Sequence, residues 1–312
     1  MPAVTDPIRI AVVGLGKIAR DQHLPALAAN PAFALAATVC PDGAVIEGVP
    51  GFASLEDLHD AGARIDAVAI CTPPQVRYGL AAAALRRGLH VLLEKPPTVT
   101  PSEADRLADL ASDVGATLFA AWHSRFASGV EPAREWLAGR RVLRGTITWR
   151  EDVRIWHPRQ AWIWQSGGFG VFDPGINALS IATRILPGTL SLAGAELEFP
   201  VNREAPIAAK LSLRLANGAP IAMDLDWRQT GPQTWDIEIE TDDGTLRLSQ
   251  GGATLTLPSG TREARDAEYP AVYARFAELV HGGLSEVDTA PLRLVADAFL
   301  HGWPVRIDAF HD

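Results

Sequence analysis

A chain of 312 residues is longer than one hydrophobic core usually supports, so two domains are expected. Hydrophobic residues make up 47% of the chain and charged residues 21%, which is typical of a globular protein and excludes a disordered or low-complexity one. The formal net charge is −9, and Lys and Arg form no basic stripe. This balance argues against nucleic acid and against an anionic membrane surface as partners.

The first half of the chain alternates strands with helices. Strands are predicted at 8–13, 34–39, 67–72, 89–93 and 117–122, and helices at 19–29, from 54 onward, 75–87 and 100–115. Thr100, Pro101 and Glu103 form an N-terminal capping pattern for the last of these helices. Strands that are separated by single helices pair in parallel through right-handed crossovers. Residues 1–123 are therefore predicted to form an α/β domain with a doubly wound, parallel Rossmann sheet.

The second half has a different pattern. Strands are predicted at 144–151, 208–215, 221–227, 235–241 and 245–249, and helices at 130–137, 177–185, 271–280 and 291–300. Asn217-Gly218 and Asp243-Gly244 are typical hairpin turns. Residues 124–312 are predicted to form a substrate-binding α/β domain with an open, largely antiparallel sheet.

A glycine motif, Gly14-x-Gly16-x-x-Ala19, lies between the first strand and the first helix. Gly14 permits a tight turn, Gly16 lets the backbone approach a pyrophosphate, and Ala19 allows close packing of helix on strand. The free N–H groups at the helix start favour phosphate. The context predicts a dinucleotide site, to which Lys17 and Ile18 also belong.

The choice of cofactor depends on the end of the second strand, where Cys40 and Asp42 lie. A carboxylate there binds the adenosine ribose hydroxyls and repels a 2′-phosphate. No Lys or Arg occurs between Arg20 and Arg64. The pattern favours NAD, with NADP as the alternative; Asp42 could instead only cap the turn at residues 41–43.

Further polar motifs follow the carboxyl ends of the later strands, where ligands bind in such sheets. These candidates for the cofactor crevice are Thr72, Pro73, Glu94, Lys95 and His123. The ammonium group of Lys95 could polarise or deprotonate a substrate hydroxyl there.

Together, the glycine motif and Glu94-Lys95-Pro96 resemble the Gfo/Idh/MocA oxidoreductase family. The resemblance implies a Rossmann half, an α/β half with an open sheet, and a catalytic Lys95. Five further stretches, at 16–23, 122–124, 151–158, 170–180 and 291–299, look like the aldose 1-dehydrogenases of that family. This closer likeness implies oxidation of the anomeric carbon of D-galactose or L-arabinose to the aldonolactone.

The general base is less certain from the sequence. Most members of the wider family pair the lysine with Asp-x-x-x-His, whereas this chain has Asp173 and Asn177. An amide cannot titrate, although it can hold a sugar hydroxyl. We therefore expect Asp173 to take the anomeric proton while Lys95 orients the hydroxyl, with His157 as the alternative base.

A sugar site combines polar hydrogen-bonding groups with an aromatic wall. Residues of these types are Glu151, Trp156, His157, Asn177 and Trp235, and the resemblance implies that they line the pocket together with Lys95 and Asp173. A ring-hydroxyl dehydrogenase of the inositol type and a non-catalytic NAD-binding sugar sensor are the alternative functions.

The two cysteines, Cys40 and Cys71, exclude a disulfide framework and favour a reducing compartment. Neither has Cys or His neighbours at metal-ligand spacing, so no metal is expected. No apolar run reaches the roughly 18–20 residues that a membrane span needs, and no secretory pattern precedes the first strand. We expect a cytoplasmic monomer or homodimer that binds a monosaccharide.

Overall fold

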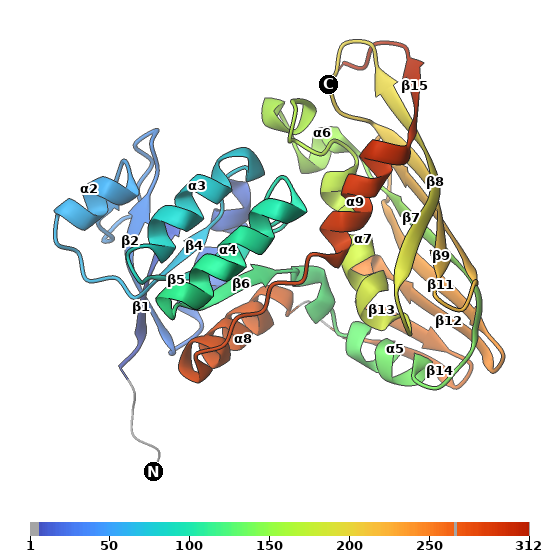
Figure 1. Cartoon of the computed structure of the whole chain (residues 1–312), viewed down its shortest axis with the longest axis horizontal. Coiled ribbons are helices and arrows are strands. Elements are labelled where there is room, and N and C mark those ends of the chain that lie inside the picture. Colours follow the sequence, from blue (N-terminus) through green and yellow to red (C-terminus); the bar gives the residue numbers. More distant parts are fainter. Residues whose placement is uncertain (1–5, 265–266, 312) are drawn as a thin grey trace. The chain divides into compact units, whose positions relative to one another are not determined.

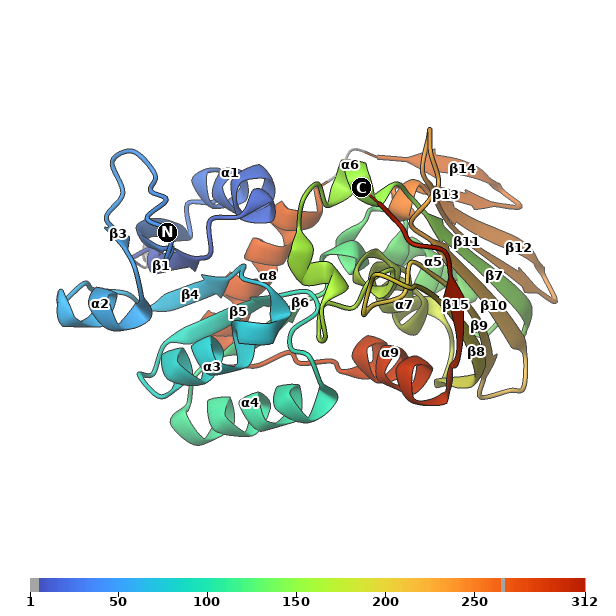
Figure 2. The ribbon, with the colours of Figure 1, turned by 90° about the horizontal axis from the view of Figure 1, so that it is seen from above.

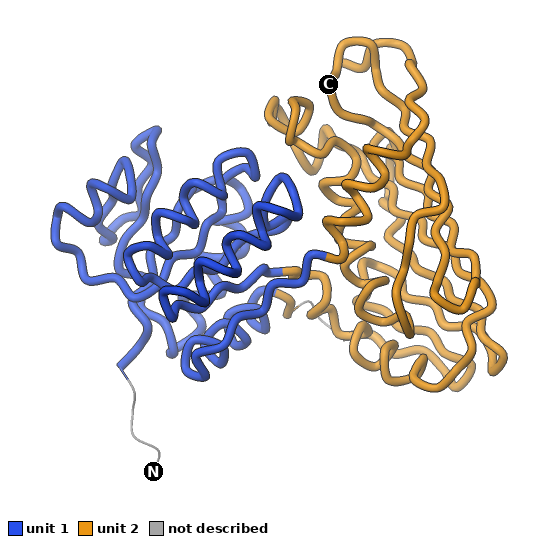
Figure 3. Tube along the Cα trace, viewed as in Figure 1, with its two compact units in different colours: residues 1–121, 269–289 blue, residues 122–268, 290–312 orange. Residues whose placement is uncertain are grey.

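The structure is a computed structural model that describes residues 6–264 and 267–311. The chain divides into two compact units, Met1–Ala121 with Tyr269–Thr289, and Trp122–Glu268 with Ala290–Asp312 (Figure 3). The segment Tyr269–Thr289 thus packs with the first unit, whereas a single boundary near residue 123 places it in the second. Its membership depends on contacts far apart in sequence, which a linear reading of the pattern does not reveal.

The first unit contains the predicted Rossmann sheet. Six parallel strands follow the order β3-β2-β1-β4-β5-β6. Their bounds are β1 Ile8–Val13, β2 Phe33–Val39, β3 Gly51–Phe52, β4 Ala67–Ile70, β5 His90–Glu94 and β6 Leu118–Ala121. The central strands are apolar throughout because helices cover both faces of the sheet.

Helices α3 and α4 cover one face of this sheet, and α1 and α8 cover the other (Figure 2). The helical bounds are η1 Ala19–His23, α1 Leu24–Ala28, α2 Leu55–Asp60, α3 Pro74–Leu85, α4 Pro101–Val114 and α8 Glu268–Gly282. The capping predictions are confirmed: Thr100 and Glu103 form a reciprocal capping box, and Ser54 accepts a hydrogen bond from the Asp57 amide.

The second unit is built on a nine-stranded sheet in the order β14-β13-β12-β11-β7-β10-β9-β8-β15. Pairing is antiparallel except between β7 and β10 and between β8 and β15, so the predicted open, largely antiparallel sheet is confirmed. The bounds are β7 Val142–Arg150, β8 Leu190–Pro200, β9 Ala208–Leu215, β10 Pro220–Asp226, β11 Thr234–Thr241, β12 Gly244–Ser249, β13 Thr254–Leu257, β14 Gly260–Glu263 and β15 Trp303–Ile307.

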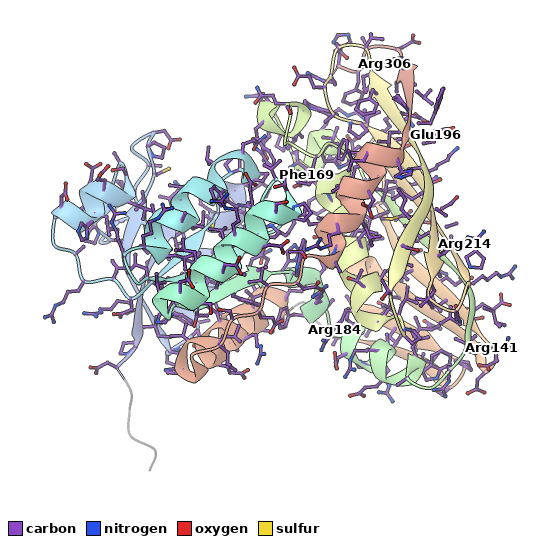
Figure 4. All side chains as sticks on the ribbon, in the orientation of Figure 1. Arg141, Phe169, Arg184, Glu196, Arg214 and Arg306 are labelled. Atoms are coloured by element: carbon purple, nitrogen blue, oxygen red, sulfur yellow. The ribbon has the colours of Figure 1, made fainter. Side chains whose placement is uncertain are left out.

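Helices α5, α7 and α9 pack on one face of this second sheet (Figure 1). The helical bounds are η2 His123–Phe126, α5 Val130–Leu137, α6 Val153–Trp156, η3 Ala161–Trp164, α7 Phe172–Ile185, η4 Gln250–Gly252 and α9 Ala290–His301. Burial alternates along β9 and β10, as it does in a sheet with one buried face. Glu196 and Arg214 lie on the side of the strands away from α7 and α9 (Figure 4).

Helix α7 begins five residues earlier than the pattern predicted. Pro174 and Gly175 look like helix breakers in the sequence, which made Asn177 the expected start. Pro174 falls in the first turn, where the missing N–H costs nothing. Gly175 faces Leu225 of β10, and its lack of a side chain lets the helix approach the sheet. The early start puts Asp173 and Asn177 on one helix.

None of the helices within the described residues combines the length and the apolar character needed to cross a membrane.

Candidate active site

The first unit presents the glycine turn directly after β1. Gly14 has φ +89°, and a Cβ atom there would lie 2.9 Å from Thr72 Cγ2 and 3.1 Å from the Thr72 amide nitrogen. Only glycine fits this turn without strain. Gly16 is exposed, with no atom within 4 Å of the position its Cβ would take. The backbone at Gly16 is therefore open to a ligand, as a pyrophosphate requires.

Thr72 supports the same interpretation. It follows β4, which pairs with β1, so it lies beside the glycine turn at the carboxyl edge of the sheet. Its Oγ1 atom is buried and has no hydrogen-bond partner among the residues that the structure describes. A buried hydroxyl without a partner calls for an explanation, and a bound ligand supplies one. The turn and this hydroxyl fit a nicotinamide dinucleotide.

The end of β2 carries the two residues predicted to contact the adenosine ribose. The Cys40 thiol donates a hydrogen bond to Asp42 Oδ1 at 2.7 Å. This bond, the Asp42 amide and the positive charge of Arg20 lower the pKa of the exposed Asp42 carboxyl, so it is ionised at neutral pH. The local role of Asp42 in the turn is therefore visible, and its contact with ribose stays a prediction.

Lys17 is exposed on the same loop and forms an ion pair with Asp21, one helical turn further on. Ile18 is half-buried beside it. Both residues follow Gly16 directly, in the segment from which a helix start offers its free N–H groups.

Lys95 follows β5 and begins the Glu94-Lys95-Pro96 turn, in which the Lys95–Pro96 peptide bond is cis. The backbone N–H of Lys95 donates to Glu94 Oε2 at 2.8 Å. Arg77 Nη1 donates to the carbonyl oxygens of Glu94, at 2.6 Å, and of Pro96. The turn that carries the candidate catalytic lysine is thus held from both sides by buried groups.

His123 was predicted to join this cofactor edge, and the structure assigns it to the second unit. There its Nδ1 atom lies 2.5 Å from Glu268 Oε2, with both side chains largely buried. Thr72, Glu94 and Lys95 lie on adjacent strand ends of the first unit, and a cofactor contact by His123 stays a prediction.

In the second unit, α7 presents Asp173 and Asn177 on one face, since residues four apart in a helix stack above each other. The Asp173 side chain is 3% exposed, and its Oδ2 atom lies 3.3 Å from His157 Nε2. The ring of His157 also contacts Gln160, with Nδ1 3.3 Å from Oε1. The two alternative bases are therefore direct neighbours.

Glu151 follows β7 and is buried, with 3% of its surface exposed. Trp227 Nε1 donates to Oε1 at 3.2 Å, and Trp235 Nε1 donates to Oε2 at 2.9 Å. A buried carboxylate is tolerated where it has such donors. The indole pair thus fixes the orientation of Glu151.

Aromatic rings surround these polar groups. Trp156 is 37% exposed and its ring centroid lies 5.1 Å from that of Trp235. The His157 ring lies 5.3 Å from Trp227, which also contacts Trp164. The second unit therefore brings together all five residues that were predicted for a sugar site, with carboxylate, amide, imidazole and indole groups adjoining.

Sequence reasoning missed several residues of these clusters. Trp227 received no role, although it ends a predicted strand as Glu151 does. His23, Tyr269 and Tyr273 surround the Glu94 carboxylate, and only the position of His23 within the motif stretch 16–23 could have drawn attention to it. No group of His, Cys, Asp or Glu suited to a metal ion occurs in the described part of the chain.

Comparison with known proteins agrees with this arrangement. The GFO_IDH_MocA family, an oxidoreductase family with an NAD-binding Rossmann fold, matches residues 8–121. The chain is 46% identical to galactose 1-dehydrogenase of Pseudomonas fluorescens over 310 residues, which cover 98% of this chain and 99% of that protein. The chain belongs to the Gfo/Idh/MocA oxidoreductase family.

Solved structures extend the likeness to the whole fold. D-galactose-1-dehydrogenase from Rhizobium etli superposes with a TM-score of 0.94 at 52% identity, over 98% of this chain and 99% of that one. KijD10, a 3-ketoreductase from Actinomadura kijaniata whose structure holds TDP-benzene and NADP, gives a TM-score of 0.83 at 21% identity, over 96% and 99%. The second likeness concerns the fold alone.

Proposed function

We propose that the enzyme is an aldose 1-dehydrogenase that oxidises the anomeric carbon of D-galactose or L-arabinose in the pyranose form. The observation that carries this proposal is the 46% identity to a galactose 1-dehydrogenase over nearly the full length of both chains. The cluster of Glu151, Trp156, His157, Asn177 and Trp235 in the second unit supports it, because a sugar needs hydrogen-bonding groups beside an apolar wall.

The bound nicotinamide supplies the acceptor for the hydride that leaves C1. The chain has to orient the anomeric hydroxyl, stabilise the negative charge that develops on its oxygen, and remove its proton. We assign the first two tasks to the ammonium of Lys95 and the third to the carboxylate of Asp173. The C1–O bond then becomes the carbonyl of the lactone.

The contact between Asp173 and His157 gives the proton a way out. Asp173 is 3% exposed and cannot readily pass a proton to bulk water, whereas His157 is 18% exposed and lies 3.3 Å away. We therefore propose that His157 accepts the proton from Asp173 and releases it to solvent. Asn177, one turn along α7 from Asp173, binds a sugar hydroxyl through its amide.

We propose NAD as the preferred cofactor. The support is the ionised Asp42 carboxylate at the end of β2, which would repel a 2′-phosphate. NADP remains the alternative, since Arg20 is close enough to act electrostatically on that carboxyl. We also propose a cytoplasmic location, because Cys40 and Cys71 are both free thiols, and a monomeric or homodimeric state.

The first test is the formation of NADH on addition of D-galactose or L-arabinose with NAD to the purified enzyme. The parent should reduce NAD with at least one of these sugars. Lys95→Ala should lose most turnover, by about 10²-fold or more, while cofactor binding measured by fluorescence stays near normal. Lys210→Ala, which changes an exposed lysine of β9, is the control and should behave as the parent. Near-normal turnover in Lys95→Ala would remove Lys95 from the mechanism.

Turnover against pH separates the two candidate bases. Asp173→Asn should lose most turnover, because an amide accepts no proton at neutral pH. His157→Ala should slow turnover less and respond to added imidazole, which can replace the missing proton carrier. If the acid limb of the parent lies near the ordinary histidine value of about 6.5 and disappears in His157→Ala, while Asp173→Asn stays active, histidine is the base.

A further inference from the structure

A cluster of buried polar side chains lies behind the Lys95 turn, entirely within the first unit. His23 and Tyr273 are fully buried, and Glu94 and Tyr269 are 2% and 4% exposed. His23 ends η1, Glu94 ends β5, and the two tyrosines belong to α8. The functional roles proposed above use none of these four side chains.

The Glu94 carboxylate is the centre of the cluster. Its Oε1 atom accepts a hydrogen bond from the Tyr269 hydroxyl at 2.5 Å and lies 2.9 Å from His23 Nε2. Its Oε2 atom accepts the backbone N–H of Lys95 at 2.8 Å. An ionised carboxylate only accepts, so His23 must donate from Nε2. Both carboxylate oxygens are thereby occupied, and one of them holds the peptide group of the candidate catalytic lysine.

The second ring nitrogen of His23 is anchored too. Its Nδ1 atom lies 2.7 Å from the Tyr273 hydroxyl, and the His23 ring makes edge contacts with both tyrosine rings. Burial alone would lower the pKa of His23, but the adjoining Cys71, Tyr273 and Glu94 more than offset this effect and raise it well above the ordinary value. A cationic His23 beside an anionic Glu94 is a buried pair that is costly to disturb on one side only.

We propose that His23 and Tyr269 are positioning residues, which hold the Glu94 carboxylate and through it fix the backbone from which Lys95 extends. The proposal rests on the catalytic role proposed for Lys95. Lys95 has a flexible side chain with four carbons, so a fixed backbone origin restricts where its ammonium can reach. An active-site group displaced by about 1 Å can lose much of its effect.

The network also gives α8 a task. The helix lies 175 residues beyond Glu94 and 250 beyond His23 in these hydrogen bonds, and it packs with the first unit. Its Phe276 ring stacks on Phe33 of β2 and on Phe119 of β6, which seats the helix on the sheet. The two tyrosine hydroxyls are therefore presented to Glu94 and His23 by a helix that is itself well anchored.

Tyr269→Phe is the sharpest test, because it removes one oxygen atom and leaves the ring in place. We expect kcat to fall about tenfold, as for the loss of one charge-assisted hydrogen bond, with the KM values for cofactor and sugar unchanged. Tyr78→Phe is the matched control: Tyr78 is half-buried on α3, packs against the core of the same unit, and should keep the parent values.

Two substitutions of His23 separate its two nitrogens. A glutamine amide reaches the place of Nε2 and can still donate to Glu94, whereas an asparagine amide reaches only the place of Nδ1. His23→Gln should therefore retain more kcat than His23→Asn. Equal losses in both variants would mean that His23 is needed only for packing.

A measurement that does not depend on turnover completes the test. The chain has three lysines, Lys17, Lys95 and Lys210, so reductive methylation with isotopically labelled formaldehyde gives few NMR signals, with Lys95 assigned by Lys95→Arg. Tyr269→Phe should shift or broaden the Lys95 signal and leave the other two unchanged, and Tyr78→Phe should move none.

The outcomes are distinct. An unmoved Lys95 signal in Tyr269→Phe overturns the positioning role, whatever happens to kcat. Should the parent oxidise no aldose, the proposed function fails, while the Lys95 signal still decides whether the network fixes this residue.

Discussion

Replacing Gly175 with alanine tests how closely α7 must approach the sheet to present its polar residues. A Cβ atom at this position would lie 2.6 Å from Leu225 Cδ1 and 3.1 Å from Cδ2. Leu225 is 1% exposed in the core of the second unit, so its methyl groups have little room to withdraw. Alanine favours a helix over glycine by about 1 kcal/mol, whereas overpacking a core costs about 1–3 kcal/mol. We expect a net loss of about 1 kcal/mol in the free energy of unfolding.

The same change should impair catalysis. If Leu225 does not withdraw, α7 must move outward, and Asp173 and Asn177 move with it, since they flank Gly175 on the same helix. Gly175→Ala should therefore lower kcat as well as stability, measured by NADH formation and by urea unfolding. Gly79→Ala is the matched control: Gly79 is an exposed helical glycine of α3 with no atom within 4 Å of the added carbon. It should gain stability, by up to about 1 kcal/mol.

A Gly175→Ala enzyme that is as stable and as active as the parent would refute this reasoning. It would mean that Leu225 repacks at no cost and that α7 keeps its place without the glycine.

Three further predictions concern the cofactor, the buried histidine and the sugar site. Asp42→Ala should lower kcat/KM for NAD more than for NADP, and an unchanged ratio would make Asp42 a turn residue only. Because the pKa of His23 is raised above its unfolded value of about 6.5, its stabilising effect is full below about pH 6.5 and is lost as the pH rises through the folded pKa. The difference in unfolding free energy between the parent and His23→Gln should therefore shrink toward alkaline pH, and one that grows would contradict the assignment. Trp235→Phe removes a donor to the buried Glu151 carboxylate and should cost about 1.5–3 kcal/mol of stability and raise KM for the sugar, whereas Trp303→Phe, at a 74% exposed site, should cost almost nothing.

The parts of the fold that local chemistry dictates could be predicted from the sequence. The buried strands, the caps at Ser54 and Thr100 and the turn at Gly14 all depend on neighbours within a few residues. Local signals failed where tertiary packing decides. Strand β8 escaped because its alternation is interrupted at Gly194, where the register with β9 shifts. The start of α7 was misjudged because Gly175 serves packing and does not mark the end of a helix.

The candidate site shows the same division. The residue types of a sugar site could be identified from the motif stretches, and the second unit brings them together. What the sequence could not give is how they are paired: that His157 contacts Asp173, or that two indoles hold Glu151. The buried partners of Glu94 were least accessible, since they are a histidine of the first helical segment and a tyrosine that follows it by 246 positions in the sequence.

The position of oxidation on the sugar is the central claim, and a labelled substrate tests it most directly. The enzyme is given D-galactose that carries deuterium at C1, together with NAD, and the reduced cofactor and the sugar product are analysed by mass spectrometry. Oxidation at C1 predicts that the deuterium appears on the nicotinamide ring, that turnover slows if hydride transfer limits it, and that the product is the aldonolactone. Reduced cofactor without deuterium, with the label retained at C1 of an oxidised sugar, would show that a ring hydroxyl is oxidised and would contradict the proposed function.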